Sequence, residues 1–205
     1  MDSATGIGAD GIPRCPWGIS APEYQSYHDE EWGRPVGGDE AIYQKLCLEG
    51  FQSGLSWLTI LRKRDGFRRA FAGFDPAAVA IFTDADVARL LADSAIVRHR
   101  GKIVATIGNA RATLRLGEQG ISLAGLLWSF EPPAGRPPGT MTELPASTPE
   151  SEALSRELRR RGFRFVGPTT VYAAMQSLGV VNDHLAGCQF WAACDDDRRA
   201  FIRPR

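Results

Sequence analysis

The 205-residue chain has few cysteines and histidines, four and three respectively, and no excess charge of either sign. Its 24 lysines and arginines balance 24 aspartates and glutamates, which argues against a histone-like or tail-driven binder of nucleic acid. Four cysteines in so long a chain do not suggest a disulfide scaffold. The sequence has no signal-peptide pattern, no lipidation motif and no apolar run long enough to span a bilayer, so we expect a cytoplasmic protein.

Four of these seven cysteines and histidines form two pairs near opposite ends of the chain, Cys15 with His28 and His184 with Cys188. Two cysteines and two histidines suit a tetrahedral Zn²⁺ ion, and a zinc with four protein ligands has no open position for catalysis. The i, i+4 spacing of His184 and Cys188 predicts that one helical turn directs both at the same ion. The pattern predicts a structural zinc that joins the two ends; the alternative is two unrelated Cys–His coincidences.

Helical patterns run through the chain and no segment shows convincing period-2 alternation, so we predict an all-α fold. The 43% hydrophobic content is sufficient for the core of one domain. We place that domain at residues 14–191, after a Gly-rich, polar extension (1–13) that we expect to be disordered and before a C-terminal tail (192–205). A Pro- and Gly-rich stretch, 131–148, is interpreted as a surface loop within the domain rather than a linker.

Two helix predictions bear on the site. The mostly apolar stretch 39–64 predicts either one buried helix or a pair of helices that meet near Gly50 and Gly54. The last helix is expected to open at Asn182 or Asp183, because both residue types are good N-caps.

A segment in the C-terminal half predicts contact with DNA. A capping box at residues 147–150 starts a helix that ends at Gly162, and another helix begins at Pro168, which together have the shape of a helix–hairpin–helix. Backbone N–H groups at the start of the second helix can bind a DNA phosphate. The alternative is a packing corner that binds no ligand. The basic cluster flanking the segment is Arg159, Arg160, Arg161 and Arg164, and the predicted DNA-backbone contacts are Arg164, Gly167, Thr169 and Thr170.

An acidic residue surrounded by apolar and aromatic ones predicts a ligand pocket. Glu49 lies in the apolar stretch, where an unpartnered carboxylate is costly to bury, so it either pairs with an arginine or is kept for a ligand. It stands at i, i+4 and i+8 with Ser53 and Trp57, which predicts a shared helical face. Four more aromatic residues, Trp17, Tyr24, Tyr27 and Trp32, crowd the N-terminal segment. This composition suits a flat ring that is cationic or bears an amino group.

The same residues fall in a series of longer motifs. In order, the chain contains WGxxxxxYxxYHDEEWG (17–33), CLEGFQSGLSW (47–57), RHRGKIVATIGNA (98–110), SFEPP, LSRELRRRGFRFVGPT and VNDHLAGC. This set, which covers the chain from about Pro13 to Phe190, closely resembles the bacterial 3-methyladenine DNA glycosylase I family. The resemblance implies an all-helical, two-lobed helix–hairpin–helix glycosylase fold with a pocket between the lobes.

The resemblance also implies roles for individual positions. Glu49 matches the carboxylate that contacts the excised base, and it is the implied catalytic residue. Trp57 matches the aromatic side chain that stacks on the base. The residues implied to line the same pocket are Trp17, Tyr24 and Tyr27. The implied zinc ligands are Cys15, His28, His184 and Cys188, and the hairpin around Gly167 matches the family's DNA anchor.

The implied activity is hydrolysis of the N-glycosidic bond of 3-methyladenine, with 3-methylguanine as a second candidate, in a nucleotide flipped out of alkylated double-stranded DNA. A monomer without lyase activity is expected. Many relatives in the wider superfamily carry an aspartate where this chain has Asn182, and Asp183 is interpreted as a helix cap. The alternatives are a protein that binds lesions without cleaving them and a zinc hydrolase unrelated to DNA, which would need a vacant metal position.

Overall fold

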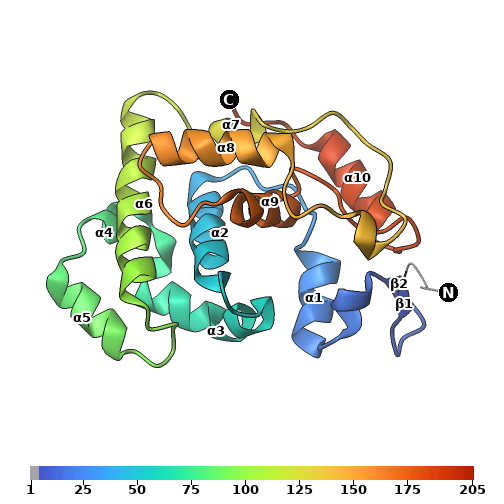
Figure 1. Ribbon diagram of the computed structural model, residues 1–205, viewed down its shortest axis with the longest axis horizontal. Coiled ribbons are helices and arrows are strands. Elements are labelled where there is room, and N and C mark those ends of the chain that lie inside the picture. Colours follow the sequence, from blue (N-terminus) through green and yellow to red (C-terminus); the bar gives the residue numbers. More distant parts are fainter. Residues whose placement is uncertain (1–4) are drawn as a thin grey trace.

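The structure, a computed structural model, describes residues 5–205 and is mostly helical over that range, as the sequence predicts (Figure 1). The α-helices are α1 (Pro22–Glu30), α2 (Asp39–Gln52), α3 (Trp57–Ala70), α4 (Pro76–Ala80), α5 (Asp84–Ala92), α6 (Arg100–Glu118), α7 (Leu123–Trp128), α8 (Pro149–Arg160), α9 (Pro168–Ser177) and α10 (Trp191–Ala200). Short 3-10 helices lie at η1 (Pro16–Ile19), η2 (Ala72–Phe74) and η3 (Met141–Glu143).

Helix α2 lies in the middle of the molecule and packs against α3, α6, α7 and α9 (Figure 1). Apolar side chains on several sides of α2 draw it into the core from Ile42 onward, whereas Glu40 and Ala41 in its first turn are exposed. The Tyr43 hydroxyl joins it to α6 by donating to the carbonyl of Thr106 over 3.0 Å. Because Glu49 stands on the last turns of this helix, the fold forces its carboxylate into the interior.

The apolar stretch 39–64 forms two helices rather than one, and the break confirms the second of the two predicted alternatives. Helix α2 ends at Gln52, Gly54 takes a φ of 81°, and the Ser56 hydroxyl accepts from the N–H of Thr59 to cap α3. The predicted shared helical face of Glu49, Ser53 and Trp57 is therefore wrong, because the chain turns between the first and the last.

Helices α8 and α9 are joined by a tight segment, residues 161–167, that we call the α8–α9 hairpin. Gly162 ends the first helix with a φ of 95°, and Pro168 starts the second, both as predicted. The side-chain amide of Asn109 on α6 holds the hairpin by two hydrogen bonds to the main chain of Arg164. Its oxygen accepts from the Arg164 N–H over 2.8 Å, and its nitrogen donates to the Arg164 carbonyl over 3.1 Å. The capping box of α8 lies one residue later than predicted, between Thr148 and Ser151.

The ends of the chain differ from expectation. Of the extension expected to be disordered (1–13), the first four residues lie outside the described range, but β1 (Gly6–Ile7) pairs antiparallel with β2 (Pro13–Arg14). Much of the expected tail forms α10, which lies in the same half of the molecule as α1, β1 and β2 (Figure 1). The division of the chain at residues 14 and 191 stays a prediction.

The helix expected to open at Asn182 or Asp183 does not form. Residues 182–188 are irregular backbone, and the next helix is α10. Asp183 instead accepts hydrogen bonds from Tyr172 and Gln176, at 2.6 and 2.8 Å, so its carboxylate serves tertiary contacts rather than a helix N-terminus. Among the described helices, none is both long and apolar enough to cross a membrane.

Candidate active site and metal cluster

A cavity of about 290 Å³ opens where η1, α1, α2, α3 and α9 meet. Its lining residues are Trp17, Tyr24, Tyr27, Trp32, Glu49, Gln52, Trp57, Met141, Leu144, Ala173 and Gln176. The structure thus brings together every residue that the sequence analysis assigned to the base pocket. The cavity is lined mainly by aromatic and other apolar side chains with a few polar groups, which is typical of a small-molecule site.

The aromatic side chains form a continuous set around this cavity. Trp57 and Tyr27 lie with ring centroids 5.5 Å apart and tilted by 48°, so the two rings make one wall. Trp17 meets Tyr24 edge to face at 5.7 Å and Trp32 at 5.0 Å. The Tyr24 hydroxyl accepts from the N–H of Leu58 over 3.0 Å, which fixes the first turn of α3 and with it Trp57.

Glu49 is 5% exposed and pairs with a lysine rather than the arginine considered from the sequence. Its Oε1 lies 3.7 Å from Nζ of Lys45, one turn earlier on α2. Burial raises the pKa of the Glu49 carboxyl above its ordinary value, and the positive charge of Lys45 offsets part of that rise. Burial likewise lowers the pKa of Lys45, with Glu49 opposing the shift. The cavity therefore holds a carboxylate that has lost most of its water and gained one distant partner.

Several cavity residues were missed by sequence reasoning. Gln52 and Gln176 contribute amide groups, and the Gln176 amide nitrogen donates to Asp183. Met141 and Leu144 come from the Pro- and Gly-rich loop, in which they are isolated apolar residues with no periodic pattern. Lys45, which contacts Glu49 without lining this cavity, was also missed, although its i, i+4 spacing from Glu49 predicts an ion pair on one helix.

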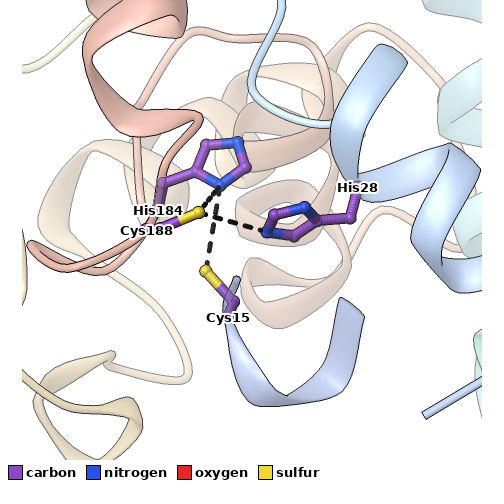
Figure 2. A group of neighbouring side chains, drawn as sticks. All are labelled: Cys15, His28, His184 and Cys188. Carbon is purple, nitrogen blue, oxygen red and sulfur yellow. Dashed lines mark hydrogen bonds between the residues drawn. The ribbon is translucent and has the colours of Figure 1, made fainter. Parts of the chain in front are cut away.

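Cys15, His28, His184 and Cys188 meet at one point, and all four are buried (Figure 2). Their potential ligand atoms lie within 4.8 Å of one another, so the four could hold a metal ion. His184 and Cys188 stand on irregular backbone, which corrects the predicted helical turn without separating the two side chains.

In each of the two histidines, the ring nitrogen that faces away from the thiols forms a hydrogen bond outside the cluster. His28 Nδ1 donates to Asp29 Oδ1 over 2.8 Å, and His184 Nε2 donates to the Trp32 carbonyl over 3.1 Å. These bonds fix each ring so that the other nitrogen faces the thiols, as in metal sites where an outer partner orients a histidine. Three of the sulfur–nitrogen distances in the cluster are 3.8 Å from Cys15 Sγ to His184 Nδ1, 3.6 Å from Cys188 Sγ to His28 Nε2 and 3.4 Å from Cys188 Sγ to His184 Nδ1.

The predicted DNA contacts lie on the α8–α9 hairpin and the first turn of α9. Arg164 and Thr169 are exposed, while Gly167 and Thr170 are partly exposed. No side chain caps the start of α9. A Cβ on Gly50 would lie 3.2 Å from that of Phe165, so the absence of a side chain at Gly50 lets the hairpin approach α2 one residue from Glu49.

Asn182 donates its side-chain amide to the Trp191 carbonyl over 2.9 Å. Neither Asn182 nor Asp183 lines the cavity. Among the residues described as lining it, Glu49 is the only one with a carboxylate.

A buried carboxylate in an aromatic cavity of a helical protein suits a flat ring that is cationic or bears an amino group. Comparison with known proteins identifies the family. The model of the methyladenine glycosylase family matches residues 17–192, and the chain belongs to that family.

Individual relatives agree with the family model. The chain is 48% identical over 179 residues to DNA-3-methyladenine glycosylase 1 of Escherichia coli, covering 86% of this chain and 96% of the relative. A crystal structure of a 3-methyladenine DNA glycosylase I superposes with a TM-score of 0.83 at 46% identity, covering 86% and 98% of the two chains. The structure of 3-methyladenine DNA glycosylase I from Staphylococcus aureus, which concerns 3-methyladenine recognition, superposes with a TM-score of 0.81 at 33% identity. The match covers 86% of this chain and 95% of that one.

Proposed function

We propose that the protein is a monofunctional DNA glycosylase that releases 3-methyladenine from alkylated double-stranded DNA by hydrolysing the N-glycosidic bond of a flipped nucleotide. Family membership supports the activity, and one observation carries the choice of base. The Glu49 carboxylate is buried in an aromatic cavity of about 290 Å³, where a cationic ring gains both stacking and charge attraction. The same groups would accept 3-methylguanine as a second substrate.

The methylated base is recognised by the Trp57 and Tyr27 rings and by the Glu49 carboxylate. The damaged ring stacks against Trp57 with Tyr27 beside it, and cation–π contact contributes about 1–2 kcal/mol once the site is desolvated. Ionised Glu49 accepts hydrogen bonds from the amino edge of the base and attracts its positive charge. Normal adenine is neutral and gains less from both groups, so selection for the methylated base results from charge as well as shape.

Cleavage needs little acid assistance. A methyl group on N3 makes adenine cationic, and the base leaves with the electrons of the N-glycosidic bond as a neutral molecule. Water then adds to the sugar carbon. This chemistry agrees with a cavity whose described lining holds no carboxylic acid besides Glu49. Asp183 is engaged with Tyr172 and Gln176 and is not needed as a proton donor.

The activity is tested by incubating the protein with alkylated duplex DNA and resolving the released bases by chromatography. We expect free 3-methyladenine with little 7-methylguanine and no strand cleavage, since no lyase step is proposed. Tight binding without release would instead support the lesion-binding alternative, which the absence of a second acid in the described cavity lining keeps open. Absence of both release and binding would contradict the proposal.

We further propose that Cys15, His28, His184 and Cys188 bind one structural zinc ion. Ligand bonds of about 2.0–2.3 Å give tetrahedral edges of roughly 3.3–3.8 Å. The sulfur–nitrogen distances of 3.4 to 3.8 Å fit those edges. Bound zinc would cross-link η1 and α1 to the 182–188 segment, and four protein ligands leave no position for the hydrolase chemistry considered as an alternative.

We also propose that the α8–α9 hairpin acts as a helix–hairpin–helix DNA anchor. The N–H groups at the start of α9 have no capping side chain and can bind a phosphate, with Thr169 and Thr170 beside them and Arg164 adding positive charge. DNA as the substrate also supports a cytoplasmic site of action and requires no second subunit.

A further inference from the structure

A second cavity of about 320 Å³ lies behind the proposed base cavity and shares the Tyr27 and Trp57 wall with it. Glu49 lines only the first cavity, whereas Lys45 lines only the second. Glu49 thus faces the first cavity and Lys45 the second, while the two side chains remain in contact as an ion pair.

Lys45 directs its ammonium group at the pocket machinery. Its side chain is 13% exposed, and Nζ donates a 2.6 Å hydrogen bond to the Tyr27 hydroxyl. Nζ also lies 3.7 Å from Glu49 Oε1, 4.2 Å from the Trp57 ring centroid and 4.6 Å from that of Tyr27. A lysine placed only to solubilise the surface would not contact these three residues at once.

We propose that Lys45 is a positioning residue for base recognition, which holds Glu49 ionised and the Tyr27 hydroxyl oriented from behind the aromatic wall. This inference rests on the proposed function. Since the Tyr27 oxygen accepts from Lys45, its own hydrogen is free to point away from the ammonium. Since the ammonium stabilises the carboxylate, Glu49 keeps its charge to lower pH than burial alone would allow.

The same charge has an opposite effect on the cationic base. A positive group behind the wall repels a positive ring in front of it and weakens the attraction of the ring faces. Lys45 therefore widens the pH range in which Glu49 is active and reduces the attraction for a cation where Glu49 is already ionised. Five other charged residues line the second cavity. Arg64 pairs with Glu31, Arg34 with Asp197 and Arg68 with Asp65, so these charges largely cancel. The fifth, Glu30, is exposed to solvent.

The test compares Lys45→Met, which keeps an unbranched apolar side chain against the wall, with the control Lys63→Met. Lys63 lies on α3 and donates to the Ser94 carbonyl, away from the cavity. In Lys45→Met, the acid limb of kcat/KM should move up by about one pH unit. The ratio of variant to wild-type kcat/KM should rise about tenfold between roughly pH 6 and pH 8.5. The control should follow the wild type.

A measurement without turnover separates this inference from the proposed function. The carboxyl of Glu49 is titrated by carbon NMR in protein labelled at glutamate, and its midpoint should be higher in Lys45→Met than in the wild type. The same titration applies to Lys45→Gln if the methionine variant does not fold. A uniform fall in kcat/KM with an unchanged acid limb and an unchanged carboxyl midpoint would show a purely structural lysine and overturn the proposal. If the wild type releases no base, the proposed function fails, yet the NMR titration still decides whether Lys45 controls the charge of Glu49.

Discussion

The cluster of two cysteines and two histidines and the aromatic cavity around Glu49 lie side by side but are built in opposite ways. In the cluster, each histidine has one ring nitrogen fixed by an outer acceptor and the other facing a thiol. In the cavity, Trp57 Nε1 is buried without a hydrogen-bond partner within the described residues, and Glu49 has only a distant lysine. Unsatisfied buried polar groups are costly, so a folded protein keeps them where a ligand will satisfy them.

The two regions are linked by shared aromatic side chains. Trp17 lines the cavity and also meets the His28 ring at 5.1 Å, while Trp32 lines the cavity and meets His184 at 4.7 Å. A satisfied cluster therefore supports one side of an unsatisfied pocket. Damage to the cluster should therefore appear first as lost stability, and damage to the cavity as lost chemistry in a stable protein.

The largest expected effect is on the cluster side. Cys188→Ser should lose the metal and destabilise the protein by more than about 4 kcal/mol, because ligand loss removes a cross-link between the two ends of the chain. Metal analysis of the wild type should give one zinc per chain, and thermal unfolding followed by circular dichroism should show the fall in Tm. The matched control is Cys47→Ser, at a buried cysteine outside the cluster, which should retain the metal. A wild-type protein that keeps its Tm after dialysis against a strong chelator would contradict a structural metal.

The next effect belongs to the cavity alone. Glu49→Gln keeps the shape of the side chain but removes its charge, and should slow excision of 3-methyladenine by about 30- to 1000-fold, equivalent to about 2–4 kcal/mol. Single-turnover assays on alkylated duplex measure the loss. The Tm should not fall, since a buried carboxylate is exchanged for a neutral amide. An undiminished rate would remove Glu49 from the mechanism.

A smaller effect is expected at the α8–α9 hairpin, which belongs to neither region. Gly167→Asp adds negative charge where a phosphate is proposed to bind, and should weaken binding to damaged and undamaged duplex alike by about tenfold. Gly135→Asp, on an exposed loop with open space around it, is the control for added charge. Binding titrations with damaged and undamaged duplex give the ratio of the variant and wild-type Kd for each DNA. A weaker Kd for damaged DNA alone would mean that the hairpin contacts the base rather than the backbone.

Sequence reasoning succeeded in this protein where the signal is local. Gly162 and Pro168 mark the ends of α8 and α9 because a left-handed turn and a fixed φ are properties of single residues. It failed at residues 182–188, where good capping residues start no helix. There the backbone follows the buried cluster, since His184 contacts the Trp32 carbonyl and the Cys15 thiol, both from distant parts of the chain.

The candidate site shows the same division. The aromatic residues and Glu49 could be predicted because their types match the chemistry of a flat ring and their motifs match a known family. Met141, Leu144 and Gln176 could not, because only the folded chain brings them to the cavity. The burial of Glu49 follows from the predicted buried helix: α2 is packed against several other helices, and the carboxylate is carried inside with it.

The smallest effect is the contribution of Glu49 to stability as pH changes, and its sign sharpens the comparison. Burial raises the pKa of Glu49 in the folded protein, so the folded state holds the proton more tightly than the unfolded state. This contribution favours folding below the ordinary carboxyl pKa and is lost as pH rises through the higher folded value. The stability of the wild type relative to Glu49→Gln should therefore fall by about 1–2 kcal/mol between about pH 4 and about pH 7, as measured by urea unfolding. If the stability of the wild type relative to Glu49→Gln instead grew with pH, groups within the folded protein would be stabilising the Glu49 carboxylate, as hydrogen bonds stabilise the histidines of the cluster. Such a result would contradict a cavity that needs a cationic ligand to stabilise Glu49.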